Sequence, residues 1–179
     1  MSATGVRVSP EWLVLREPAD AAARSTELAE RLGRHLGDCD LVIHDLGGGS
    51  GAMGRWLAPR LPEPQHWVVH DRDPDLLKLV TAGSDTVTVE ARLTDITRLT
   101  PDDLSGASLI TASALLDLLT ADELVRMLRA CGMRPMLLAL TVVGRVILSP
   151  ADPLDLRIGA AFNAHQRRCA GRGGPRGSG

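Results

Sequence analysis

The residues best suited to chemistry form a glycine-rich segment, His44-Asp45-Leu46-Gly47-Gly48-Gly49-Ser50-Gly51. Glycines let the backbone turn sharply and approach a ligand without a Cβ in the way. A helix that begins after this segment would present free N–H groups and the positive end of its dipole to the same place. The segment therefore suits the binding of a carboxylate, a phosphate or a nucleoside.

Three interpretations of this segment compete. Gly47, Gly49 and Ala52 fit a permissive dinucleotide-binding pattern. An S-adenosylmethionine site would use the same glycines, and a structural turn that binds no ligand is the third interpretation. No Lys-Ser or Lys-Thr pair follows the glycines, which excludes a phosphate-gripping P-loop.

Three acidic residues favour a ligand over a plain turn. Asp45 precedes the first glycine by two residues, where it would repel a pyrophosphate but attract the sulfonium and ammonium groups of S-adenosylmethionine. Asp71 follows the next apolar run, where a carboxylate accepts both hydroxyls of a ribose, as it also does in NAD sites. Asp95 follows the third run, where it would accept a hydrogen bond from an adenine amino group.

The elements that position these residues follow from hydrophobic periodicity. We expect a helix after Gly51 and others that begin at Pro74, Thr120 and Asp152. The sequence also predicts a helix at 18–36 with Pro18 in its first turn, and strands at 41–46, 66–70, 86–91, 108–111, 136–143 and, as a return strand, 145–148.

Strands that alternate with helices predict an α/β fold, which is a Rossmann-like, doubly wound, mostly parallel sheet with helices on both faces. Ligands bind such sheets beyond the carboxyl ends of the strands, where the strand order switches. The length of 179 residues predicts one domain over residues 1–168. Its expected parts are a helical N-terminal lead at 1–39, a cofactor-binding core at 40–149 and a C-terminal helix at 150–168, with a flexible basic tail at 169–179.

Composition argues against several classes of protein. The net charge of -2 and the presence of one Phe, three Trp and no Tyr argue against nucleic-acid partners. Three widely spaced cysteines without a CxxC pair argue against a zinc site and against a disulfide framework, so no metal is expected. No apolar run approaches the ~20 residues that a membrane span needs, and the N-terminus lacks the plan of a signal peptide. We therefore expect a cytoplasmic protein.

From IHDLGGGSGAMG through WVVHDRDPDLL, LTDIT and LITASALLDLL, the chain resembles class I S-adenosylmethionine-dependent methyltransferases. The resemblance covers about residues 40–145 and is closest to the small-molecule type found in actinobacteria. It implies S-adenosyl-L-methionine as cofactor and S-adenosylhomocysteine as product. The cofactor-binding residues that it implies are Asp45, Gly47, Gly48, Gly49 and Gly51 at the methionine part, Asp71 at the ribose, Arg72, Asp95 and Ile96 at the adenine, and Thr111, Ala112 and Ser113 beside the sulfonium.

Methyl transfer is an in-line displacement at the sulfonium, so a general base is needed only if the acceptor must lose a proton. His165 is the first candidate for that base, and His70 and Asp117 are further candidates. A partly exposed helix histidine without a catalytic role is the simpler interpretation of His165. The segment TASALLDLL lacks the Asn/Asp-Pro-Pro-aromatic and Pro-Cys elements of nucleobase methylation. A small-molecule acceptor is therefore expected, and a protein or peptide acceptor is the alternative.

The sequence departs from the family at its C-terminal end. The family sheet has seven strands and closes with an antiparallel hairpin. No strand is predicted after the helix that begins at Asp152, so we expect the closing hairpin to be missing and the sheet to be truncated. A homodimer or a partner chain would cover the open edge. The alternative function is a non-catalytic S-adenosylmethionine-binding or S-adenosylhomocysteine-binding protein or partner subunit. An NAD(P)-dependent oxidoreductase comes third, because Asp45 disfavours a dinucleotide.

Overall fold

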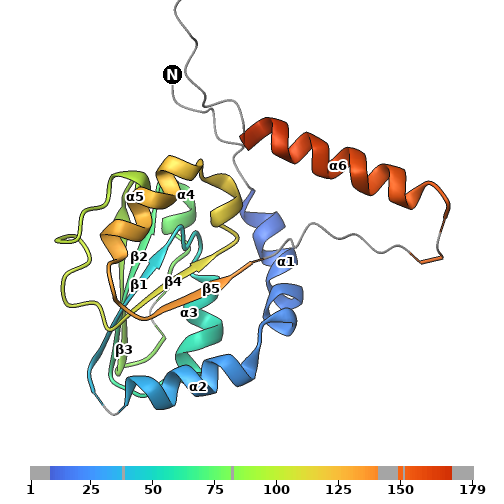
Figure 1. The fold of residues 1–179 in the computed structure, drawn as a ribbon. Coiled ribbons are helices and arrows are strands. Elements are labelled where there is room, and N and C mark those ends of the chain that lie inside the picture. Colours follow the sequence, from blue (N-terminus) through green and yellow to red (C-terminus); the bar gives the residue numbers. More distant parts are fainter. Residues whose placement is uncertain (1–8, 38, 82, 141–148, 151, 171–179) are drawn as a thin grey trace, which may run out of the picture.

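A computed structural model describes residues 9–37, 39–81, 83–140, 149–150 and 152–170 (Figure 1). No helix in these ranges is long and apolar enough to cross a lipid bilayer. The elements, with η for short 3-10 helices, are α1 (Pro10–Ala23), α2 (Thr26–Leu36), β1 (Leu41–Leu46), α3 (Ala52–Leu57), η1 (Ala58–Arg60), β2 (Gln65–Asp71), α4 (Pro74–Leu77), β3 (Val87–Leu93), η2 (Ile96–Arg98), β4 (Leu109–Ser113), η3 (Leu116–Leu118), α5 (Ala121–Cys131), β5 (Met136–Ala139) and α6 (Asp155–Ala170).

Within the described residues the sheet has five strands, all parallel, in the order β3-β2-β1-β4-β5. Helices α2 and α3 cover one face and α5 covers the other (Figure 1). The predicted Rossmann-like, doubly wound fold is therefore confirmed. Among the described residues no strand follows β5, and the return strand expected at 145–148 lies outside them.

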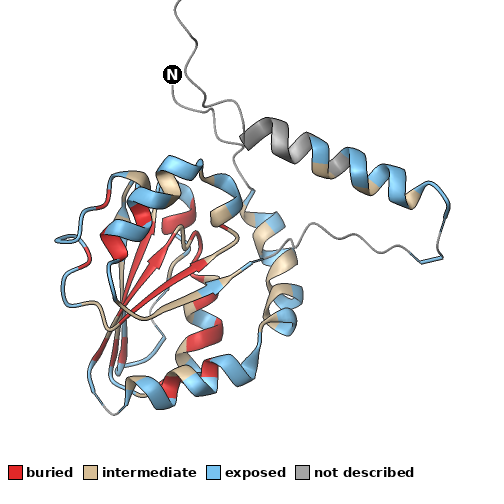
Figure 2. Ribbon diagram, viewed as in Figure 1, coloured by how far each residue is buried: buried red, intermediate tan, exposed pale blue. Residues whose placement is uncertain are grey.

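The core consists of one apolar cluster on each face of the sheet (Figure 2). Because successive side chains of a strand point to opposite faces, Ile43 packs toward α3 whereas Leu46 packs toward α5. The same alternation places Asp45 on the α3 side and His44 on the α5 side. The switch in strand order lies between β1 and β4, so the carboxyl ends of these two strands form the crevice in which ligands bind in such folds.

The helix predicted at 18–36 is wrong in its extent, because the lead forms two helices. Helix α1 begins at Pro10, where the side chain of Ser9 accepts a hydrogen bond from Trp12 N. Pro18 lies inside α1 rather than in a first turn. In this interior position it has no backbone N–H to donate to the preceding turn. A new helix begins after Ser25, whose hydroxyl accepts from Leu28 N. The serine caps, rather than the proline, set both helix starts.

Candidate functional site

The glycine segment lies at the switch point predicted for it. It follows β1 directly, and β1 pairs with β4 so that Asp45 is opposite Thr111 and Leu46 is opposite Ala112. The structure therefore brings the glycine segment, which the resemblance assigns to the methionine part, next to residues 111–113, which it assigns to the sulfonium group.

The backbone of the glycine segment requires glycine at most positions. Gly47, Gly49 and Gly51 have φ angles of 64°, 55° and 83°, in the left-handed region. At Gly48 a Cβ would lie 2.5 Å from Asp45 Oδ2 and 2.7 Å from a Val69 methyl group. The loop therefore lies directly against the Asp45 carboxylate.

Asp45 is a buried acid with one unpaired oxygen. It is 0% exposed, and Thr111 Oγ1 donates to its Oδ1 over 2.7 Å. Its Oδ2 has no hydrogen-bond partner in the part of the chain that the structure describes. Burial raises the pKa of Asp45 to about 7, although the Thr111 hydrogen bond and the Arg24 charge oppose the shift. A buried carboxylate oxygen without a donor is costly, so this atom indicates a place for a cationic or donating group.

Asp71 ends β2 and joins the glycine loop to that strand. Its Oδ2 accepts from Gly49 N and its Oδ1 accepts from Asp73 N, each over 2.9 Å. Gly48 N also donates to the carbonyl of His70, over 3.1 Å. The half-buried Asp71 carboxylate is thus held next to the glycine loop.

The end of β3 lies beside Asp71, since Thr94 N donates to the Asp71 carbonyl over 2.8 Å. Asp95 is exposed and caps η2, where its Oδ1 accepts from the backbone N and hydroxyl of Thr97. These hydrogen bonds lower the pKa of Asp95. Ile96 is buried and Arg72 is exposed. The acids predicted at the ends of β2 and β3 therefore lie on neighbouring strand ends.

Arg24 is a site residue that the sequence did not reveal. It lies between α1 and α2, and its guanidinium donates to Ala52 O over 3.3 Å and to Ser113 Oγ over 3.4 Å. The guanidinium lies 5.5 Å from the centroid of the Trp56 ring. No carboxylate lies within salt-bridge distance of it among the described residues. Burial lowers the pKa of Arg24, while the charges of Asp20 and Asp45 act against that shift.

A cavity of about 270 Å³ opens beside Arg24. Met53, Trp56, Leu137 and Leu138 give it an apolar lining, and Ser113 of β4 borders it. Through Ser113 this small, mostly apolar space between the helical lead and β5 reaches the carboxyl end of β4.

Arg55 is the second residue that sequence reasoning missed. Its guanidinium donates to both carboxylate oxygens of Glu17 over 2.8 and 2.6 Å, and to the carbonyl and hydroxyl of Ser50 over 2.6 and 3.2 Å. The contact with Arg55 lowers the pKa of Glu17. Arg55 therefore holds α1 against the glycine loop.

The candidate bases are not brought together at the site. His70 lies on the α5 side of the sheet, with Nε2 2.9 Å from His44 Nδ1 and Nδ1 3.4 Å from Thr94 Oγ1. Asp117 is exposed on η3. His165 belongs to α6, which lies apart from the strand ends (Figure 1), and its side chain is outside the described part. Within the described residues, no three His, Cys, Asp or Glu side chains are grouped as metal ligands.

The sequence of the chain matches no family model and no curated protein. Its structure is similar to a Methanococcus maripaludis protein assigned as an S-adenosyl-L-methionine-dependent methyltransferase, with a TM-score of 0.54 at 12% identity over 94% of this chain and 77% of that one. A TehB-like S-adenosylmethionine-dependent methyltransferase from Corynebacterium glutamicum matches with a TM-score of 0.51 at 18% identity, over 86% and 80% of the two chains. The plantazolicin methyltransferase BpumL, solved with S-adenosylhomocysteine, matches with a TM-score of 0.52 at 14% identity, over 88% and 65%.

The chain has the fold of class I S-adenosylmethionine-dependent methyltransferases. It spans between about half and four fifths of the length of methyltransferase structures that it matches. In this methyltransferase fold the glycine segment, Asp45 and Asp71 occupy the carboxyl ends of β1 and β2, where the sequence predicted a nucleoside-binding site.

Proposed function

We propose that this chain binds S-adenosylmethionine and transfers its methyl group to a small-molecule acceptor. The observation that carries the proposal is the buried Asp45, whose Oδ2 lies under the glycine loop without a donor among the described residues. Both the sulfonium and the ammonium group of S-adenosylmethionine are positive. This ligand would therefore supply a positively charged partner for the Asp45 carboxylate. The methyltransferase fold supports the same cofactor.

The cofactor would be held by the residues at the carboxyl ends of four strands. Asp71 already accepts from two backbone N–H groups, but each carboxylate oxygen has a further lone pair for a ribose hydroxyl. The remaining assignments follow the strand ends: Asp45 and the glycines 47–51 bind the methionine part, Arg72, Asp95 and Ile96 border the adenine, and Thr111, Ala112 and Ser113 lie beside the sulfonium.

Arg24 would bind the carboxylate of the methionine part. It is a half-buried cation with two long hydrogen bonds and no carboxylate partner in the described ranges. It bridges Ala52 and Ser113, which follow the glycine segment and end β4. The fork of a guanidinium matches a carboxylate in geometry and charge.

The cofactor supplies a methyl group on a good leaving group. The chain contributes by holding donor and acceptor in line, which removes much of the entropic barrier to their reaction. The cavity of about 270 Å³ beside Ser113 is the space that we assign to the acceptor, and its size and apolar lining suit a small molecule. A base is needed only for an acceptor that must lose a proton.

The outer edge of β5 is the surface where we propose that a second copy or a partner chain binds. Among the described residues no strand pairs with this edge, and Leu138, which also borders the cavity beside Arg24, is 38% exposed. Unpaired strand edges favour association. Sedimentation velocity should show a dimer that Leu138→Lys weakens. We also propose a cytoplasmic location, where thiols such as Cys39 and Cys131 would stay reduced.

Isothermal titration of the full chain tests the cofactor site. We expect S-adenosylmethionine and S-adenosylhomocysteine to bind with micromolar affinity, and Asp71→Asn to weaken both by about tenfold or more, since one charge-assisted contact is lost. Asp102→Asn, at an exposed loop position, is the matched control and should bind as the original chain does. Binding of NAD in place of the sulfur nucleosides would contradict the proposal.

A second titration tests the role of Arg24. Arg24→Gln should weaken S-adenosylhomocysteine by roughly 10-fold to 100-fold but leave 5′-methylthioadenosine unchanged, because that nucleoside has no carboxylate. Arg60→Gln is the control, because Arg60 also stacks on Trp56, at 4.7 Å. Equal losses for both nucleosides would show that Arg24 acts on the structure of the loop instead.

A further inference from the structure

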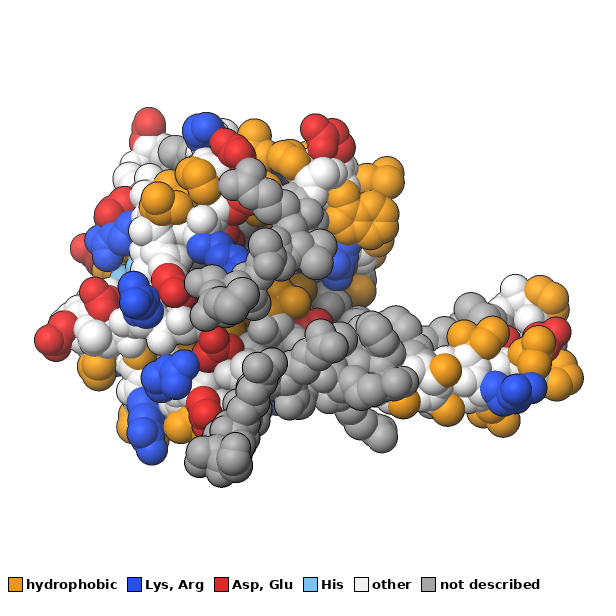
Figure 3. Space-filling model, turned by 90° about the horizontal axis from the view of Figure 1, so that it is seen from above, with side chains coloured by type: hydrophobic (Ala, Val, Ile, Leu, Met, Phe, Trp, Pro, Cys, Tyr) orange, Lys and Arg blue, Asp and Glu red, His pale blue; other side chains and the backbone are white. Residues whose placement is uncertain are grey.

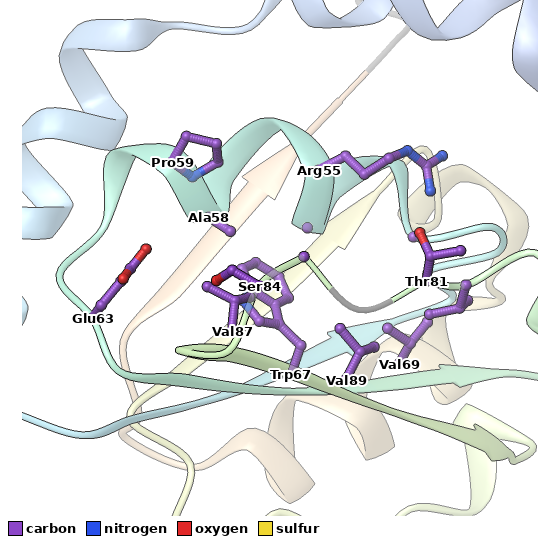
Figure 4. A pocket seen from close by; sticks show the side chains of 14 residues that line it. Arg55, Ala58, Pro59, Glu63, Trp67, Val69, Thr81, Ser84, Val87 and Val89 are labelled. Atoms are coloured by element: carbon purple, nitrogen blue, oxygen red, sulfur yellow. The ribbon is translucent and has the colours of Figure 1, made fainter.

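A second cavity, of about 520 Å³, lies between α3 and the sheet, over β2 and β3 (Figure 4). Trp67 and Val69 of β2 and Val87 and Val89 of β3 form its floor, and Pro59 lies on the opposite wall. The first three of these floor residues are 1, 2 and 7% exposed. The volume falls within the range of about 300–1,000 Å³ that is common for small-molecule sites.

The cavity has a physical origin in the sequence of β3 and the shortness of α4. Val87, Val89 and Ala91 share one face of β3, and polar residues alternate with them. An apolar sheet face of this kind needs a cover. Helix α4 ends at Leu77 after a single turn, so in the part of the chain that the structure describes no long helix follows β2 to cover this part of the sheet. The space that remains is bounded by α3, η1 and the loop that carries Ser84.

The charged groups that border the cavity already have partners. The guanidinium of Arg55 is bound by Glu17. The carboxylate of Glu63 accepts a hydrogen bond from the hydroxyl of Thr86. No unpaired charge therefore faces the cavity from its described lining, and water in such a space finds few polar partners. These properties favour a neutral and apolar occupant.

We propose that this cavity is a binding site for a neutral, largely hydrocarbon small molecule. It is separate from the crevice at the switch point, since Asp45, Asp71 and Arg24 do not line it. Its wall reaches Gly51 and Arg55, so the two sites are neighbours. The proposal does not depend on methyltransferase activity.

Titration of the full chain with N-phenyl-1-naphthylamine, a neutral apolar fluorophore, tests the site. We expect saturable binding of one probe with micromolar affinity. Val89→Phe and Ala58→Leu fill the cavity from the sheet and from the helical wall, and each should weaken binding at least about tenfold. The matched control is Val125→Phe on α5, where Val125 is 45% exposed, and it should bind the probe as the original chain does.

Three outcomes would overturn the proposal. The first is a lack of saturable binding, and the second is equal binding by the control and both filled variants. The third is displacement of the probe by S-adenosylhomocysteine, which would place the probe in the crevice instead. Val89→Phe and Ala58→Leu lie on different elements, and thermal melts show whether each variant is folded. If one fails to fold, the other still tests whether the probe binds in the cavity. The two variants also test the cavity in a chain that binds no S-adenosylhomocysteine, because they are compared by binding of the apolar probe alone.

Discussion

At the scale of single residues, Asp45 lowers the stability of the fold, and we propose that it binds the cofactor. Its pKa is about 7 in the folded chain against 3.8 for the ordinary group. Between these values the folded state keeps a proton that the unfolded chain has lost, so this group makes the fold less stable as pH rises toward 7. Above that pH the full cost remains, on the order of 4 kcal/mol. A cationic ligand favours the ionised form, so its binding should strengthen as pH rises through 7.

Asp45→Asn should therefore stabilise the protein and impair its site. The amide keeps an acceptor for the Thr111 hydroxyl and removes the buried charge, although its NH₂ group lacks a partner. We expect a gain of about 1–3 kcal/mol at pH 8, little or no gain at pH 5, and weaker binding of S-adenosylmethionine. Urea unfolding at both pH values and titration at pH 8 measure this. An equal change in stability at pH 5 and pH 8 would contradict the assigned pKa.

His44 and His70 predict acid sensitivity. Burial lowers the pKa of each from 6.5 to about 4, so the unfolded chain takes up protons in this range before the folded chain does. Stability should thus fall as pH drops from about 6.5 to about 4, by on the order of 3 kcal/mol for each histidine. His44→Gln should flatten this dependence in urea unfolding measured from pH 7 to pH 5. His35→Gln, at an exposed position of α2, should leave the slope as steep as before.

At the scale of elements, the glycine loop depends on close approach between its backbone and β1. Gly48→Ala would bring a Cβ to 2.5 Å from Asp45 Oδ2, so we expect a loss of about 1–3 kcal/mol and of cofactor binding. Gly54→Ala in α3 is the matched comparison, because its Cβ would meet the Trp67 ring at an ordinary 3.4 Å. That variant should keep binding and gain up to about 1 kcal/mol from helix propensity. Thermal melts and titration with S-adenosylhomocysteine compare the pair, and equal losses would contradict the loop geometry.

Helix α1 has no buried residue and is held beside the loop by Arg55 and Glu17. Glu17→Gln should therefore increase amide hydrogen exchange within α1 while changing global stability by less than about 1 kcal/mol, as for partly exposed ion pairs generally. Glu30→Gln, at an exposed position of α2, should not change that exchange. Unchanged protection of α1 in the Glu17 variant would show that apolar contacts hold the helix.

At the scale of the whole molecule, stability should reside in the sheet and the helices packed on it. Helix α6 projects from this body, and hydrophobic side chains lie along the projecting part (Figure 3). None of its described side chains is buried, and Leu156 is 86% exposed. Removal of residues 151–179 should change the free energy of unfolding by less than about 1 kcal/mol, since little apolar surface is uncovered. A larger loss in urea unfolding would show that α6 packs on the body in solution.

Local patterns determined the order of the elements and part of the site. Strand alternation and helix periodicity act over a few residues, so the doubly wound sheet was predictable from them. Glycines 47, 49 and 51 were identifiable for the same reason, because their φ angles follow from a turn between adjacent elements. The break between α1 and α2 was missed, because a leucine repeat favours one helix and the competing serine cap is a weaker signal.

Only the tertiary structure decided which distant residues meet. Arg24 reaches Ser113 across 89 positions, and Arg55 reaches Glu17 across 38, so no spacing in the sequence pointed to either contact. The unpaired oxygen of Asp45 and the cavity over β2 and β3 also depend on how closely separate elements pack. Packing between elements is set by the volumes of side chains from the whole chain. For this physical reason the glycine loop was predictable from the sequence, whereas the positions of Arg24 and Arg55 beside it were not.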